Sequence, residues 1–140
     1  MSFISPSRGR LSFEEMFHDI VGYVKESPDH KYRVIIGTDS QLGEETCFVT
    51  AVIVHRDGRG GRYYYARDKE QVGRSLRQRI FYETARSLAV ASMLAGKLAE
   101  NGYADLNVEI HLDVGENGET RDLIREVVGM VVGSGFHARI

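Results

Sequence analysis

Three strand-like segments follow one another near the middle of the chain and restrict what it can fold into. Residues 32–39, 46–55 and 61–67 are rich in β-branched and aromatic side chains, which are common in strands. The stretch Asp57-Gly58-Arg59-Gly60, between the second and third segments, has the residue types of a tight turn. The sequence therefore predicts antiparallel strands joined by short turns.

Helical patterns lie on both sides of these strands. Residues 12–26 begin with a capping box formed by Ser12 and Glu15 and carry an apolar stripe. Residues 75–101 contain no proline and many good helix formers, so they predict the longest helix. A strand, a helix and a strand are then predicted over residues 107–113, 120–132 and 136–140. This order mixes antiparallel and parallel pairing and predicts an α/β fold.

Composition limits the class of protein. The 140 residues fit one domain spanning residues 1–140, with helix 12–26 packed on the sheet. Cys47 is the only cysteine, which favours a reducing, cytoplasmic setting. The sequence also allows an oligomer. No run approaches the roughly 18 apolar residues of a membrane span, so we expect no membrane contact. The net charge of -2 argues against a general polyanion binder, and nucleic acid is expected to contact a local patch.

Three acidic residues lie where apolar elements end or face the core. Asp39 ends an apolar run, and Asp113 ends the predicted strand 107–113. Glu83 falls near the middle of the apolar face of helix 75–101. A carboxylate in such a place is costly unless a cation or hydrogen-bond donors compensate it. Three carboxylates brought together by three elements suggest a divalent metal centre.

Each acid also has an ordinary structural interpretation. Glu83 could form a surface ion pair with Arg79 or Arg86, which lie one helical turn away. Asp39 could serve turn chemistry in its Thr-Asp-Ser context, and the strand side that carries Asp113 could simply face water. It is the joint placement of the three acids that favours a functional interpretation.

The motifs around these acids form a combination that resembles a known family. They are Ile36-Gly37-Thr38-Asp39-Ser40-Gln41, Leu76-Arg77-Gln78-Arg79-Ile80 with Glu83-Thr84, and His111-Leu112-Asp113-Val114-Gly115-Glu116-Asn117-Gly118. The chain from Leu11 onward resembles the YkuK-type family of bacterial proteins within the ribonuclease H-like fold. The resemblance implies a five-stranded mixed sheet flanked by helices and a metal-dependent nuclease activity on DNA or RNA.

Carried over residue by residue, the resemblance implies that Asp39, Glu83 and Asp113 are catalytic and bind Mg²⁺ or Mn²⁺, metals that prefer hard oxygen ligands. A fourth acid in that fold usually comes from a helix after the fifth strand. Asp122 is the candidate for this place here, with Glu116 as another. An incomplete site leads to the alternative function, a module that binds nucleic acid or protein without catalysis.

Further residues are predicted to support the site. Arginines near the start of helix 75–101 are suited to phosphate, through the helix dipole and the guanidinium groups; they are Arg74, Arg77 and Arg79. Tyr63, Tyr64 and Tyr65 offer stacking surfaces, although tyrosines are also ordinary strand residues. Auxiliary roles are predicted for Ser40, Gln41 and His111, with His111 as a proton shuttle or a partner of a metal ligand, or as a packed strand residue.

Overall fold

The predicted strands of residues 32–67 form the centre of a sheet in the computed structural model, which describes residues 1–58, 60–73, 75–114 and 121–140. They are β3 (Tyr32–Gln41), β4 (Thr46–Arg56) and β5 (Gly61–Glu70), each antiparallel to the next. All three run slightly further than their sequence pattern predicts. Asp39 consequently lies inside β3, two residues before its end.

The other side of β3 carries parallel pairing. The helix α2 (Leu76–Glu100) leads to β6 (Asn107–His111), which pairs parallel with β3. The helix α3 (Arg121–Gly133) then leads to β7 (His137–Arg139), which is parallel to β6. The predicted α/β class with a mixed sheet is confirmed.

The predicted number of five strands is wrong, because the sheet has seven in the order β2-β1-β5-β4-β3-β6-β7. The two additional strands form a hairpin, β1 (Ser2–Ser5) and β2 (Gly9–Ser12), ahead of the first helix. Phe3 of this hairpin is fully buried in the core, and Ile4 pairs with Tyr65 of β5. A four-residue strand has little local signal of its own, so the edge of β5 and the burial of Phe3 decide its structure.

The first helix begins where its sequence predicts. In α1 (Phe13–Glu26), the Ser12 backbone N–H donates to Glu15 Oε1 at 2.9 Å, and the Glu15 N–H donates to Ser12 Oγ at 3.1 Å. These two bonds satisfy amide groups that the helix itself leaves without partners.

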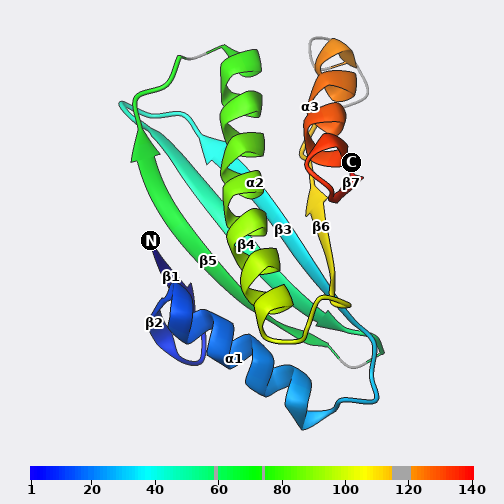
Figure 1. Cartoon of the computed structure of the whole chain (residues 1–140). Coiled ribbons are helices and arrows are strands. Elements are labelled where there is room, and N and C mark those ends of the chain that lie inside the picture. The colour runs from blue at the N-terminus through cyan, green and yellow to red at the C-terminus, as the bar shows by residue number, and fades with distance from the viewer. Residues whose placement is uncertain (59, 74, 115–120) are drawn as a thin grey trace.

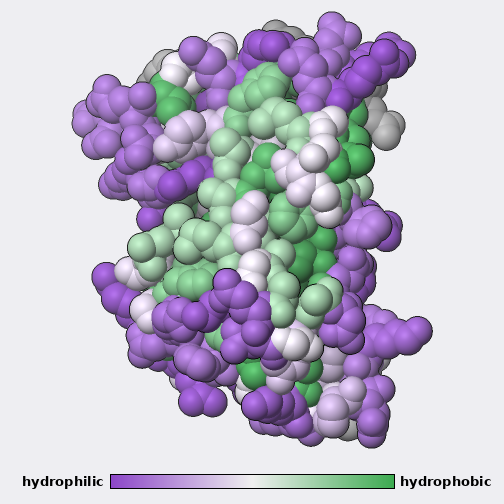
Figure 2. Space-filling view, viewed as in Figure 1, coloured by the Kyte–Doolittle hydropathy of each residue, from purple (hydrophilic) through white to green (hydrophobic). Residues whose placement is uncertain are grey.

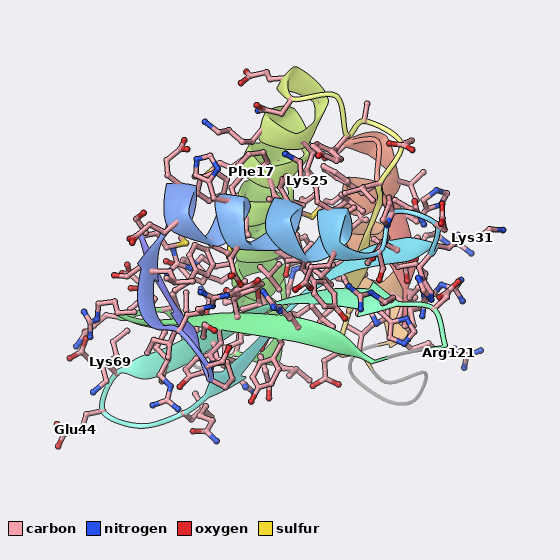
Figure 3. The ribbon with its side chains drawn as sticks, turned by 90° about the horizontal axis from the view of Figure 1, so that it is seen from below. Phe17, Lys25, Lys31, Glu44, Lys69 and Arg121 are labelled. Carbon is pink, nitrogen blue, oxygen red and sulfur yellow. The ribbon has the colours of Figure 1, made fainter. Side chains whose placement is uncertain are left out.

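All three helices pack on the same face of the sheet, as Figures 1 and 3 show. Alternate residues of the central strands meet them there and form the core, among them Val34, Ile36, Val52, Val54, Tyr64 and Ile110. Within the described residues, no helix is long and apolar enough to cross a membrane. The opposite face of the sheet carries no described helix.

Candidate functional site

Hydroxyl groups join α2 to the sheet close to the predicted acids. Thr38 Oγ1 of β3 lies 2.8 Å from Ser87 Oγ of α2 and 3.1 Å from Thr50 Oγ1 of β4. All three residues are buried, so each hydroxyl depends on the others for hydrogen bonding. Ser87 lies one helical turn after Glu83, and this cluster therefore holds the Glu83 turn of α2 against β3.

We expect Thr38→Val to lower the free energy of unfolding by about 1–3 kcal/mol, because it leaves buried hydroxyls without a partner. Valine has nearly the same shape as threonine, so cavity formation contributes little. Chemical denaturation of Thr38→Val, Ser87→Ala and the double variant measures the coupling. Ser87→Ala should cost less in the Thr38→Val background than alone, and equal costs in both backgrounds would contradict the shared bond.

Glu83 points from α2 toward the end of β3 and is partly buried. Ser40 Oγ donates a hydrogen bond to Glu83 Oε2, and Arg79 Nη1 donates to the same Ser40 oxygen at 3.4 Å. Arg86 is engaged elsewhere, in an ion pair with Asp68 of β5. Glu83 is therefore oriented toward the sheet and does not form the surface ion pair with Arg86.

The electrostatic setting of Glu83 is unusual. Burial raises its pKa to about 7, and the negative charges of Asp39 and Asp113 raise it as well, against the lowering effects of the Ser40 hydrogen bond and the Arg79 charge. A carboxyl group whose pKa is raised by burial together with neighbouring negative charges is a candidate functional group. The fold thus brings β3, α2 and the segment after β6 together at one end of the sheet.

Asp39 and Asp113 are both exposed and line a hollow of about 730 Å³ on the open face of the sheet. Asp39 Oδ1 accepts a hydrogen bond from the Ser40 backbone N–H at 2.9 Å. Asp113 also borders a small cavity beneath α2 that Glu83 lines. Asp39 therefore lies on β3 and Asp113 follows the neighbouring β6, while Glu83 of α2 shares the small cavity with Asp113.

The donor set suits a hard divalent cation, since three carboxylates of separate elements share one region. Their present spacing is wider than a bound ion requires. Among the described residues, no three His, Cys, Asp or Glu side chains are close enough to hold one metal ion. Metal binding would therefore require side-chain rotation, for which the exposed Asp39 and Asp113 have room.

The remaining predicted residues divide into those near the acids and those away from them. Gln41 and His111 line the same hollow as Asp39, and Arg79 lies beside Ser40. Arg77 is directed to α3, where its Nη2 lies 2.9 Å from Glu126 Oε2.

Two of the predicted residues, Arg74 and Glu116, lie outside the described residues. Asp122 is exposed in the first turn of α3. No described contact joins Asp122 to the three acids. The fourth carboxylate therefore remains a prediction.

A buried carboxylate next to the site, Glu109, has a structural role that was not predicted from the sequence. Its side chain is 2% exposed and accepts from His111 Nε2 at 2.9 Å and from Arg33 Nη1 at 3.3 Å, while Arg139 Nε lies 3.9 Å away. Burial alone would raise the pKa of Glu109, but the His111 hydrogen bond and the charges of Arg33, His111 and Arg139 outweigh it, so the pKa is lowered.

Glu109 alternates with His111 and Asp113 along the sequence, on the strand side that could simply face water. This side is not simply exposed to water, because the parallel register of β3 and β6 brings Arg33 near Glu109. Such a register is not visible in the sequence of either strand alone. His111 therefore faces the hollow while hydrogen-bonded to a buried anion, as expected for a histidine whose orientation is held by a partner.

Comparison with known proteins agrees with this architecture. A family model described as Ribonuclease H-like matches residues 15–140. The Uncharacterized protein YkuK of Bacillus subtilis (strain 168) is 34% identical over 152 residues, which cover 99% of this chain and 87% of that protein. No solved structure matches the chain.

Proposed function

Because the chain belongs to the ribonuclease H-like family, in the group of Bacillus subtilis YkuK, we propose that it is a divalent-metal-dependent nuclease that hydrolyses nucleic-acid phosphodiesters. Asp39, Glu83 and Asp113 are the proposed catalytic and metal-binding residues. The observation that carries the proposal is the pKa of Glu83, raised to about 7 by burial and by the two neighbouring aspartates. A fold that concentrates carboxylates in this way is most simply explained by a cation that neutralises them.

The proposed roles follow from where each side chain lies. Bound Mg²⁺ or Mn²⁺ would supply Lewis-acid activation of water and of the phosphate oxygens. Asp39 and Asp113 would hold the cation from the open side of the sheet, and Glu83 from the side of α2. Ser40 orients Glu83 through its hydroxyl. Arg79, whose Nη1 donates to Ser40 Oγ at 3.4 Å, is the arginine best placed to contact a substrate phosphate.

The direct experiment is a cleavage assay with Mn²⁺ on labelled single-stranded, duplex and DNA–RNA hybrid substrates. The wild-type protein should cleave at least one substrate, and Asp39→Asn and Asp113→Asn should not. Asp105→Asn is the matched control, because Asp105 is an exposed aspartate that lines a different pocket with Tyr32 and Tyr103. Cleavage that survives in both site variants would assign the activity to a contaminant or to another site.

A module without catalysis is the second candidate function. It is favoured by one observation, that the described residues contain no three-ligand group already arranged for a metal. In this case, the family fold would serve to bind nucleic acid or protein. Metal binding to the native state separates the two candidates.

We expect Mn²⁺ to stabilise the protein against thermal unfolding. A ligand that binds only the native state at ten times its dissociation constant contributes about 1.4 kcal/mol, which corresponds to a few degrees in Tm for a chain of this size. Differential scanning fluorimetry over a Mn²⁺ series measures the shift. The shift should disappear in Asp39→Asn and persist in Asp105→Asn, and its absence from the wild-type protein would favour the module.

A further inference from the structure

The open face of the sheet carries a continuous surface that leads to the acids. Strand register places three rows of side chains across this face, each running from β3 through β4 to β5. The rows are Ile35–Ile53–Tyr63, Gly37–Ala51–Tyr65 and Asp39–Val49–Arg67. We call these nine residues the open-face platform. Its last row begins at Asp39, one of the proposed catalytic residues.

Apart from Asp39 and Arg67, the platform residues carry no charge, and the platform is accessible. The hollow of about 730 Å³ lies over it and reaches from Ile53 to Asp39, His111 and Asp113. Ile53 is 37% exposed and Tyr63 is 52% exposed. Large exposed apolar and aromatic side chains that adjoin one another mark a binding surface more often than scattered ones do. The described helices all cover the other face (Figure 3), so the platform keeps this access.

Cationic residues lie within and beside the platform although the whole chain has a net charge of -2. The cationic residues that register places on this face are Arg33, Arg67, Lys69 and Arg139. Arg67 is exposed at the end of the platform and lies 5.5 Å from the centroid of the Tyr65 ring. Arg33 and Arg139 are partners of the buried Glu109 on this face, so Arg67 and Lys69 carry the positive charge without that partner. The exposed acids Asp39 and Asp113 lie at one end. A polyanion that also carries flat apolar groups matches this distribution of charge.

We propose that the open-face platform binds the unpaired bases of single-stranded nucleic acid and leads the strand to the acids beside β3. This inference rests on the proposed function, because the hollow ends at Asp39 and Asp113, two of the three proposed metal-binding carboxylates. Unpaired bases present flat apolar faces that can lie on tyrosine and aliphatic side chains. In a duplex, those faces are stacked inside the helix and cannot reach the sheet. The platform therefore selects single strands over duplexes, with Arg67 positioned for a backbone phosphate.

The test is fluorescence anisotropy with labelled oligonucleotides in EDTA, where no metal-dependent cleavage occurs. A 12-nucleotide single strand of mixed sequence, as DNA and as RNA, is compared with the same sequence in a duplex. At least one single strand should bind about tenfold more tightly than its duplex. Tyr63→Ala should weaken single-strand binding about tenfold, within the range for loss of one stacked base, and Ile53→Glu should weaken it at least as much.

The control surface is the helix-covered side. Figure 2 shows apolar residues along its middle, where α2 lies, and Met93 of α2 is 48% exposed. Met93→Ala removes an exposed apolar side chain without touching the platform, so single-strand affinity should be unchanged. Circular dichroism and thermal melting of each variant establish that the fold is retained.

Several outcomes would overturn the proposal. Equal or tighter binding of the duplex would do so, as would wild-type affinity in both Tyr63→Ala and Ile53→Glu. If sedimentation shows a dimer that Ile53→Glu dissociates while single-strand affinity is unchanged, the platform is an interface between copies of the chain.

The outcome of the cleavage assay is separate. Single-strand binding in EDTA without cleavage in Mn²⁺ supports the platform and refutes the nuclease. Cleavage in Mn²⁺ without preferential binding of single strands in EDTA supports the nuclease and refutes the platform.

Discussion

Replacing Glu83 with glutamine should abolish cleavage and, at the same time, stabilise the metal-free protein above pH 7. The amide keeps the size of the side chain and still accepts the hydrogen bond from Ser40, but it carries no charge and is a poor metal ligand. Loss of one electrostatic stabiliser of a transition state typically lowers the rate about 100-fold or more. We therefore expect at least that loss of cleavage in Mn²⁺, measured under single-turnover conditions.

The stability effect has the opposite sign and depends on pH. The pKa of Glu83 rises from 4.5 to about 7 on folding, so the folded state binds a proton more tightly than the unfolded state does. Ionised Glu83 therefore opposes folding, with a cost that grows as pH rises from about 4.5 to 7 and is complete above pH 7. Glu83→Gln removes this cost, which we place at about 1–2 kcal/mol at pH 8 because water partly screens the half-buried side chain.

The control for Glu83 is Glu44, which extends into solvent from the turn between β3 and β4 (Figure 3). Glu44→Gln removes the same charge from the chain and should change neither cleavage nor stability measurably. Urea denaturation at pH 4.5 and pH 8 in EDTA is the measurement. A Glu83→Gln protein that is no more stable than wild type at pH 8 would show that burial and the charges of Asp39 and Asp113 do not disfavour ionised Glu83.

Replacing Arg33 with methionine should lower the free energy of unfolding by about 2–3 kcal/mol at pH 7. Glu109 is almost completely buried, and Arg33 Nη1 is one of its charged partners at 3.3 Å. Removing one partner of a buried ion pair typically costs about 3–5 kcal/mol, because it leaves a charge that neither water nor protein compensates. His111 and Arg139 remain near Glu109, so we expect the lower part of that range or slightly less.

A double-mutant cycle with Glu109→Gln isolates this effect from the packing of the arginine stem. Arg33→Met should cost much less in the Glu109→Gln background, with a coupling of about 2 kcal/mol. The lowered pKa of Glu109 means that its stabilising contribution is present above its unfolded pKa and is lost as pH falls through the folded pKa. The penalty of Arg33→Met should therefore shrink in acid. A penalty that is the same in both backgrounds would assign the role of Arg33 to aliphatic packing.

These two carboxylates show how far the sequence could predict the site. Helical periodicity placed Glu83 on the apolar face of its helix, because the position of a side chain around a helix depends on its number along that helix. It left a surface ion pair with Arg79 or Arg86 as an alternative. The pKa of Glu83 could not be predicted in the same way. It depends first on burial of the side chain and then on the charges of Asp39 and Asp113, and both are set by how α2 lies across β3.

The same division holds for the fold. Interactions between residues close in the chain produce the hairpins of β3, β4 and β5, the capping box of Ser12 and Glu15, and the long helix α2, so these could be predicted from local patterns. The edge hairpin of β1 and β2, the burial of Glu109 beside Arg33, and the open-face platform could not, because they depend on tertiary contacts. Each requires the register or packing of strands that are distant in sequence, and single-strand patterns of polarity do not encode which neighbours a strand will meet.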